Sequence, residues 1–260
     1  RGAVLGSMIY AGVMWPDGFH QSGPFASLVL TDSKKMSAEQ RERAMKQLEA
    51  CAEEGAIHIE KHEVTPIDVS HAMLCEHGRG LNELSYDCAF NIIAALLGRG
   101  LPVSTVFVDT VGSAKRYKKR LTERFADCGV VFVVESRADF KYKVVSAASV
   151  VAKVTRDALL DGWVYAQNIP AQDRAWGNGY DTTLPTDWLA RNCHPLMGFP
   201  DLVRWSWPSA QKAAEKLPNH FFKKEVRGEG GSRRRATRPS HPLRLLSERL
   251  CFTTRCDFFA

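Results

Sequence analysis

Two aspartates stand at the ends of two apolar, β-branched runs of this sequence. Asp109 closes the run 105–108, and Asp139 follows shortly after the run 130–134. Open α/β sheets place their chemistry at the carboxyl ends of the strands, so neighbouring strands would bring these two carboxylates together. Like charges at close range call for a divalent cation. A strand-end aspartate can also be a cap or turn residue, but two at matching positions favour a metal site.

Four other residues could bind a ligand, and each also has an ordinary structural interpretation. Lys34 lies in an Asp-Ser-Lys-Lys run before a helix, where it could hold a phosphate or be an ordinary surface residue beside capping Asp and Ser residues. Tyr180 ends a Gly-Asn-Gly-Tyr loop that could present the ring to a sugar or base, or bury it in the core. Asn82 and Ser146 are polar residues on apolar helices, and either could bind a ligand or satisfy an internal hydrogen bond.

Apolar strands alternate with amphipathic helices along the chain, which predicts an α/β domain with three layers or a mixed sheet. Strands are expected at 4–15, 56–64, 105–108 and 130–134. Helices are expected at 37–54, 66–73, 84–95, 113–125, 144–163, 185–191 and 209–217. The first helix carries the clearest signals, because Ser37 can cap it with Gln40 answering, and Gly55 can end it.

The positive charge of the chain is concentrated at its carboxyl end. The 260 residues carry a formal net charge of +6 with a pI of about 9.0. Residues 218–260 hold ten Lys and Arg against four Asp and Glu, a surplus that equals the whole excess. Residues 1–217 are therefore neutral in sum, and we expect 218–260 to be a basic, disordered tail. It is either a solvated extension or an arm for nucleic acid or localisation.

The seven cysteines are odd in number and include no Cys-x-x-Cys pair. This pattern argues against a disulfide framework or a structural zinc site and indicates a reducing, intracellular compartment. The sequence has no run as long as a membrane span and no secretory signal. We therefore expect no membrane association.

Taken in order, the motifs of residues 1–216 closely resemble the type 2 ribonuclease H family, also called ribonuclease HII. The stretch 198–211 is most similar to the catalytic large subunit of the eukaryotic enzyme. The motifs that carry the resemblance are Arg-Gly at 1–2, Asp-Ser-Lys at 32–34, Val-Asp-Thr at 108–110, Arg-Ala-Asp at 137–139, the block 145–157, Gly-x-Gly-Tyr at 177–180 and Gly-Phe-Pro at 198–200.

The resemblance implies a ribonuclease H-like mixed sheet flanked by helices, with a small C-terminal helical extension, in a catalytic domain at 1–217. It implies an endoribonuclease of the ribonuclease H type that hydrolyses the RNA strand of RNA–DNA hybrids and cuts 5′ of ribonucleotides embedded in duplex DNA. Two Mg²⁺ or Mn²⁺ ions would serve as cofactors. Two accessory subunits and nuclear residence are implied by the eukaryotic likeness.

The same resemblance assigns roles to individual residues. Asp109 and Asp139 would be metal ligands, while the Arg-Gly pair would read the ribose 2′-hydroxyl that separates RNA from DNA. The remaining expected contacts are with the sugar at the RNA–DNA junction and with backbone phosphates. The substrate-binding residues expected on this basis are Arg1, Gly2, Lys34, Asn82, Ser146 and Tyr180.

One departure from the family pattern concerns the start of the chain. The family has four metal-binding carboxylates, and two of them form the Asp-Glu pair of an Asp-Glu-Ala-Gly-Arg-Gly motif. Because this sequence begins at the Arg-Gly of that motif, we expect it to begin inside a larger protein and to lack both acids and the central first strand. Two strand edges would then be exposed, and we expect the chain as written to be poorly stable or to aggregate.

Three alternatives remain open. A catalytically inactive scaffold could bind nucleic acid or partner subunits without cleavage. Another nuclease or a transposase of the same fold would share the carboxylates without the glycine–tyrosine loop or the Asp-Ser-Lys motif. A small-molecule α/β enzyme is less consistent with the sequence, which has no nucleotide-cofactor glycine fingerprint and no nucleophile elbow.

Overall fold

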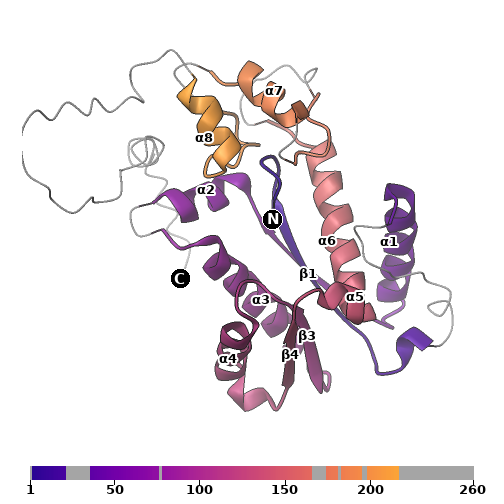
Figure 1. The fold of residues 1–260 in the computed structure, drawn as a ribbon. Helices are drawn as coiled ribbons and strands as arrows, with labels where there is room; N and C mark the ends of the chain where they lie inside the picture. The colour runs from indigo at the N-terminus through magenta and orange to yellow at the C-terminus, as the bar shows by residue number, and fades with distance from the viewer. Residues whose placement is uncertain are drawn as a thin grey trace, which may run out of the picture. The chain divides into compact units, whose positions relative to one another are not determined.

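In the computed structural model, the described residues are 2–21, 36–75, 78–165, 174–180, 183–194 and 198–216. The predictions for Arg1, Lys34 and the tail 218–260 lie outside these residues. Helices and strands alternate as expected for an α/β protein (Figure 1). The chain divides into two compact units: unit 1 comprises Arg1–Gly6, Thr65–Gly80 and Trp163–Ala260, and unit 2 comprises Ser7–Val64 and Leu81–Gly162.

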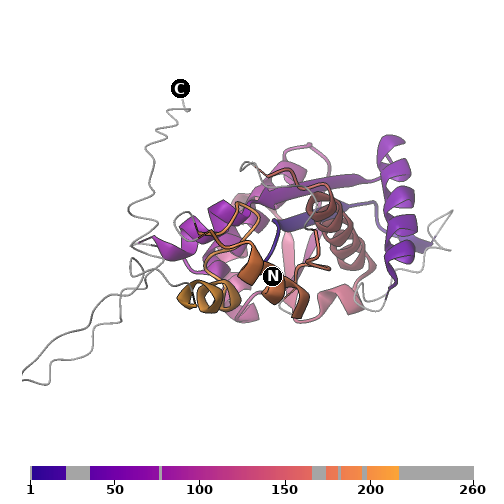
Figure 2. The same cartoon turned by 90° about the horizontal axis from the view of Figure 1, so that it is seen from above.

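Unit 2 contains two pairs of hydrogen-bonded strands. Strand β1 (Met8–Met14) runs antiparallel to β2 (His58–Val64), and the two lie side by side in Figure 2. Strand β3 (Thr105–Asp109) runs parallel to β4 (Val131–Glu135). Both kinds of pairing occur, as a mixed α/β fold requires, and the described strands form two separate two-stranded sheets.

The helices of unit 2 follow from short local signals. They are α1 (Ala38–Glu53), α3 (Leu81–Leu97), α4 (Ala114–Arg124), α5 (Ala138–Lys141) and α6 (Lys143–Asp161), with 3-10 turns at Phe19–Gln21 and Ala126–Cys128. The predicted capping box of α1 is confirmed: Ser37 Oγ accepts from the Gln40 amide at 3.2 Å, and Gln40 Oε1 accepts from the Ser37 amide at 2.8 Å. Among the described helices, none has both the length and the apolar character needed to cross a membrane.

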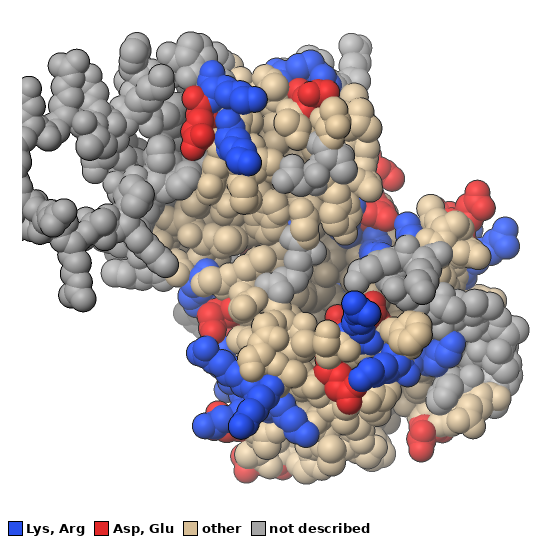
Figure 3. Space-filling view, viewed as in Figure 1, with Lys and Arg blue, Asp and Glu red and all other residues tan. Residues whose placement is uncertain are grey.

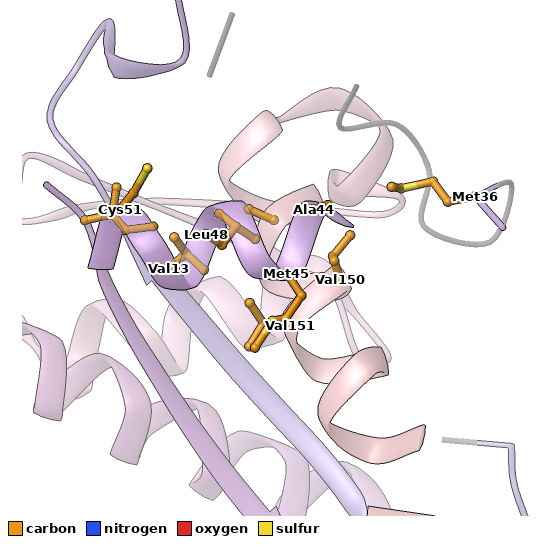
Figure 4. Close-up of a cluster of buried hydrophobic side chains, with 10 residues drawn as sticks. Val13, Met36, Ala44, Met45, Leu48, Cys51, Val150 and Val151 are labelled. Atoms are coloured by element: carbon orange, nitrogen blue, oxygen red, sulfur yellow. The ribbon is translucent and has the colours of Figure 1, made fainter. Parts of the chain in front are cut away.

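Two apolar clusters hold the helices of unit 2 against the strands. In the first, α1 and α6 pack on β1 through side chains that include Leu48, Val150 and Val13 (Figure 4). In the second, α3 and α4 pack with β4 through Tyr86, Leu121 and Phe132, among others. Full burial of such side chains stabilises a fold by roughly 1.5–3 kcal/mol each.

The contact between α3 and β1 depends on a glycine. A Cβ atom placed on Gly12 of β1 would lie 2.5 Å from Ile92 Cγ2 and 3.0 Å from Leu96 Cδ1 of α3. These two side chains of α3 can lie this close to the strand because Gly12 has no side chain.

Unit 1 is assembled from three separate parts of the sequence. Its helices are α2 (Pro66–Leu74), α7 (Thr183–Arg191) and α8 (Pro208–Glu215). Leu5 forms an antiparallel bridge with Val203, and the Gly6 amide donates to Leu202 O at 2.9 Å. The Arg204 side chain is 2% exposed, and its Nε donates to Gly6 O at 2.8 Å.

The prediction of one strand over 4–15 was wrong in its extent. Strand β1 begins at Met8, whereas Ala3 and Leu5 form isolated bridges to Tyr180 and Val203 in unit 1. The break falls at Gly6, which has a φ of 78°. That conformation interrupts an extended strand, and glycine adopts it without steric cost.

We predict that Gly12→Ala destabilises the protein by about 1–3 kcal/mol, because the new methyl group overlaps Ile92. Chemical denaturation would measure the loss. Gly80→Ala is the matched control, since nothing lies within 4 Å of its Cβ position. The penalty of Gly12→Ala should shrink in an Ile92→Ala background, and an equal penalty in both backgrounds would contradict the proposed overlap.

Thiol reactivity should follow burial. Burial raises the pKa of the Cys88 thiol to about 11, with a smaller contribution from Asp87, and burial also raises the pKa of Cys193 to about 11. Cys128 is exposed. At pH 8, iodoacetamide should therefore alkylate Cys128 well before Cys88 or Cys193, because the thiolate is the reactive form. Peptide mapping by mass spectrometry checks the order, and unfolding should abolish the difference.

Candidate active site

The parallel pair β3 and β4 brings two carboxylates to one sheet edge. Asp109, the last residue of β3, is in register with Glu135, the last residue of β4. The Thr110 amide donates to Glu135 O at 2.9 Å, so the pairing extends past the strand end. Asp109 is exposed there. This is the edge at which the sequence predicted a site.

A tight turn after β4 leads the chain back to Asp109. Arg137 adopts the left-handed conformation (φ 57°, ψ 40°), which costs a non-glycine residue of order 1 kcal/mol. Ala138 follows, fully buried, and its amide donates to Asp109 Oδ1 at 3.1 Å. The structure therefore places the Asp109 carboxylate against the backbone of the residue that immediately precedes Asp139.

The direction of the Asp109 side chain follows from the pleat of β3. Residues two apart on a strand face the same side of the sheet, so Asp109 shares a face with Phe107. The Phe107 ring lies 4.3 Å, centroid to centroid, from Tyr142, which connects α5 to α6. Asp109 thus points to the side where α5, with Asp139 in its first turn, begins.

Glu135 is a third carboxylate at this edge that the sequence analysis missed. Lys141 of α5 donates a short hydrogen bond to its Oε2. That hydrogen bond, with the positive charge of Lys141, holds the pKa of Glu135 below its usual value, and the pKa of Lys141 is raised in turn. The signal was present, because Glu135 closes β4 just as Asp109 closes β3. The partnership with Lys141 was not readable, since α5 was not predicted.

The aspartate pair suits a cation whose other ligands are substrate oxygens and water molecules. Among the residues that the structure describes, no group of three or more His, Cys, Asp or Glu side chains could hold a metal ion. Mg²⁺ is usually bound by one or two carboxylates plus substrate phosphates and water. Asp109 and Asp139 fit that donor set. Of their four carboxylate oxygens, Oδ1 of Asp109 is the only one that accepts a hydrogen bond within the described residues.

Asn82 lies beside the loop that follows Asp109. It is in the first turn of α3, and a Cβ atom placed on Gly112 would lie 3.2 Å from its Nδ2 atom. The same loop is held by Tyr86 of α3, whose hydroxyl donates to Val111 O at 3.0 Å. The structure therefore brings Asn82 to the part of unit 2 that carries Asp109.

Ser146 lies in the first turns of α6 and is 1% exposed. Its amide donates to Tyr142 O at 3.0 Å. This burial favours the internal hydrogen-bonding interpretation that the sequence left open, and a contact between Ser146 and substrate stays a prediction.

In unit 1, the structure brings Gly2 and Tyr180 together. Ala3 forms an antiparallel bridge with Tyr180, and the Val4 amide donates to Gly179 O at 2.9 Å. A Cβ atom on Gly2 would lie 3.7 Å from two Tyr180 ring carbons. Tyr180 is 39% exposed, so the loop presents this residue at the surface rather than in the core.

Most of the sequence matches one protein family. The family model described as Ribonuclease HII matches residues 1–210. The chain belongs to the ribonuclease HII family. Among its relatives, the A subunit of Ribonuclease H2 from Arabidopsis thaliana is 34% identical over 245 residues, covering 92% of this chain and 80% of the relative. The A subunit of Ribonuclease H2 from Homo sapiens is 37% identical over 218 residues, covering 83% of this chain and 70% of the relative.

The fold of this ribonuclease HII family member also matches a solved structure. The crystal structure of ribonuclease H2 from Pyrococcus horikoshii superimposes with a TM-score of 0.65 at 24% identity, covering 84% of this chain and 94% of that one. The predicted fold class is therefore confirmed, and the eukaryotic relatives confirm the predicted resemblance to the catalytic large subunit.

The hydrogen bond at Asp109 predicts different effects for two substitutions. Asp109→Ala should lower the free energy of unfolding by about 1–3 kcal/mol, because it leaves the buried Ala138 amide without an acceptor. Asp109→Asn keeps an acceptor oxygen and should cost clearly less. Urea denaturation of both variants measures the difference. Asp127→Ala, at an exposed position of the turn Ala126–Cys128, serves as the control. Equal losses for both Asp109 variants would contradict a structural role for this bond.

Proposed function

We propose that this protein is a divalent-metal-dependent endoribonuclease that hydrolyses the RNA strand of RNA–DNA hybrids and cuts 5′ of single ribonucleotides embedded in duplex DNA. Membership of the ribonuclease HII family supports the reaction class. The observation that carries the proposal is the hydrogen bond from the Ala138 amide to Asp109 Oδ1. It joins the end of β3 to the first residue of α5, which immediately precedes Asp139.

In this proposal, Asp109 and Asp139 hold Mg²⁺ or Mn²⁺ and do not act as nucleophiles. When bound, such ions would activate a water for in-line attack on phosphorus and would neutralise the charge that develops on the departing 3′-oxygen. The Asp109 carboxylate is oriented before substrate arrives, since its Oδ1 atom is already fixed by the Ala138 amide. Such preorganisation avoids reorienting the ligand during the reaction.

The other predicted residues would bind and select the substrate. The backbone at Gly2, with Arg1, would contact the ribose 2′-hydroxyl, and the ring of the exposed Tyr180 would pack on the sugar at the RNA–DNA junction. Asn82 and Lys34 would bind backbone phosphates.

We also propose that the protein works in the nucleus with two accessory subunits. The relatives are each named as one subunit of Ribonuclease H2, which supports a complex of several chains. Residues 198–217 are the candidate contact region. Co-purification of the tagged protein from its natural cells would test the complex, and recovery of a single polypeptide would contradict it.

The test of the proposed function is a cleavage assay on the complete natural protein and its complex. With Mg²⁺, it should cut an RNA–DNA hybrid and a DNA duplex containing one ribonucleotide, and leave plain duplex DNA intact. Asp109→Asn and Asp139→Asn should each lower kcat at least about a hundredfold, because each removes a charged ligand. Asp127→Asn should retain activity. Binding of the hybrid without any cleavage would support the scaffold alternative instead.

A further inference from the structure

Helix α4 carries a surface of positive charge that no part of the proposed reaction uses. Its buried side is formed by Tyr117 and Leu121, which belong to the apolar cluster with α3 and β4. Its first two turns expose four residues, all of them basic, and Thr122, Glu123 and Arg124 are exposed in the last turn. This basic face of α4 consists of Lys115, Arg116, Lys118 and Lys119.

Neighbouring acids neutralise little of this charge. Arg120, on the inner side of the helix, forms an ion pair with Glu83 (Nη1 to Oε2, 2.6 Å), and its guanidinium lies over the Tyr86 ring. Within the basic face, only Lys119 forms an ion pair among the described residues, with Glu123 at 3.6 Å, and both side chains of that pair are largely exposed. An exposed pair of this kind holds its partners weakly. Most of the positive charge therefore faces solvent.

The arrangement is the reverse of what helix stability favours. The positive pole of the helix dipole disfavours cations in the first turn, yet the first turn of α4 contains Lys115 and Arg116 and no acidic residue. Its amino-terminal cap is also weak, because Ser113 Oγ accepts from the Arg116 amide at 3.5 Å. Stability therefore does not explain the basic face, whereas binding of a polyanion does.

The basic face begins close to the candidate active site. Only residues 110–113 separate Asp109 from the start of α4. Gly112 of this loop lies next to Asn82, the predicted phosphate contact. Figure 3 shows lysine and arginine side chains gathered over the part of unit 2 where Figure 1 draws α4. The edge with Asp109 thus continues, through Asn82, into the basic face.

We propose that the basic face of α4 binds the phosphate backbone of the nucleic acid duplex beyond the scissile phosphate. This inference takes its substrate from the proposed function. Lys115 and Lys119 are one helical turn apart, a rise of about 6 Å, while each strand of B-DNA presents a phosphate about every 3.4 Å along the duplex axis. The two lysines can therefore reach phosphates of one strand that lie a nucleotide or two apart. Because this contact depends on phosphate charge and not on base sequence, it should bind an RNA–DNA hybrid and plain duplex DNA equally well.

The experiment compares two double variants of the complete protein. Lys115→Gln/Lys119→Gln removes the centre of the basic face, and Arg43→Gln/Lys46→Gln removes the same charge from exposed positions of α1. Binding to a labelled hybrid and to plain duplex DNA is measured by fluorescence anisotropy in EDTA at several salt concentrations. Melting temperatures verify that both variants fold like the wild type.

We expect the α4 variant to lower the slope of log Kobs against log salt by about 0.9 for each phosphate that it no longer neutralises, equally on both duplexes. In the cleavage assay its KM for hybrid should rise while kcat stays unchanged. The α1 variant should keep the wild-type slope. An unchanged slope for the α4 variant, or an equal change for the α1 variant, would overturn the inference, as would failure of the wild type to bind either duplex.

Failure of the proposed function has a different signature. If the wild type binds both duplexes but cuts neither the hybrid nor the embedded ribonucleotide, the ribonuclease proposal fails. The salt slopes would still decide the role of α4, because they are measured without metal ions and without cleavage.

Discussion

The hydrogen bond between the Ala138 amide and Asp109 Oδ1 is the contact on which the candidate site depends. It connects the end of β3 to the turn after β4, two points that are 29 residues apart in sequence. Register pairing of Asp109 with Glu135 brings the two strand ends level, and the left-handed Arg137 turns the chain back toward Asp109. A strained backbone position at such a point is typical of functional sites, where surrounding packing holds it in place.

The carboxylates at this edge differ in what holds them. The Glu135 carboxylate is engaged by Lys141, which lowers its pKa and makes it a structural partner of α5. Asp109 has one oxygen fixed by a backbone amide and is exposed, while Asp139 forms no ion pair in the described structure. The edge therefore combines a neutralised acid with a pair of acids whose charge is still available to a cation.

The distribution of charge illustrates how a total can mislead. Residues 1–217 have a formal net charge of zero, and the sequence therefore predicted positive charge only in the tail 218–260. In the folded chain, Glu83 of α3 binds Arg120, and the exposed Lys115, Arg116, Lys118 and Lys119 have only Glu123 as an ion-pair partner among the described residues. Folding therefore gathers an excess of positive charge on one helix, although residues 1–217 are neutral in sum.

Local structure was largely predictable from the sequence, because its causes act over a few residues. The capping box at Ser37 and Gln40, the proline at the start of α2 and the acid at the end of β3 all appear in the structure as predicted. The family was also readable, since its motifs are short and ordered. The sequence alone therefore determined the fold class and named Asp109 and Asp139.

Only the tertiary structure decided how these pieces meet. The break of the first strand at Gly6 and the closeness of Gly12 to Ile92 each depend on contacts between residues distant in sequence. The pairing of Glu135 with Lys141 spans six residues, but it depends on the turn at Arg137. The short helix α5 was missed because a turn in which a non-glycine residue is left-handed has no sequence signal. Strand register and side-chain packing are long-range interactions, and a local pattern carries no information about which partner a residue will find.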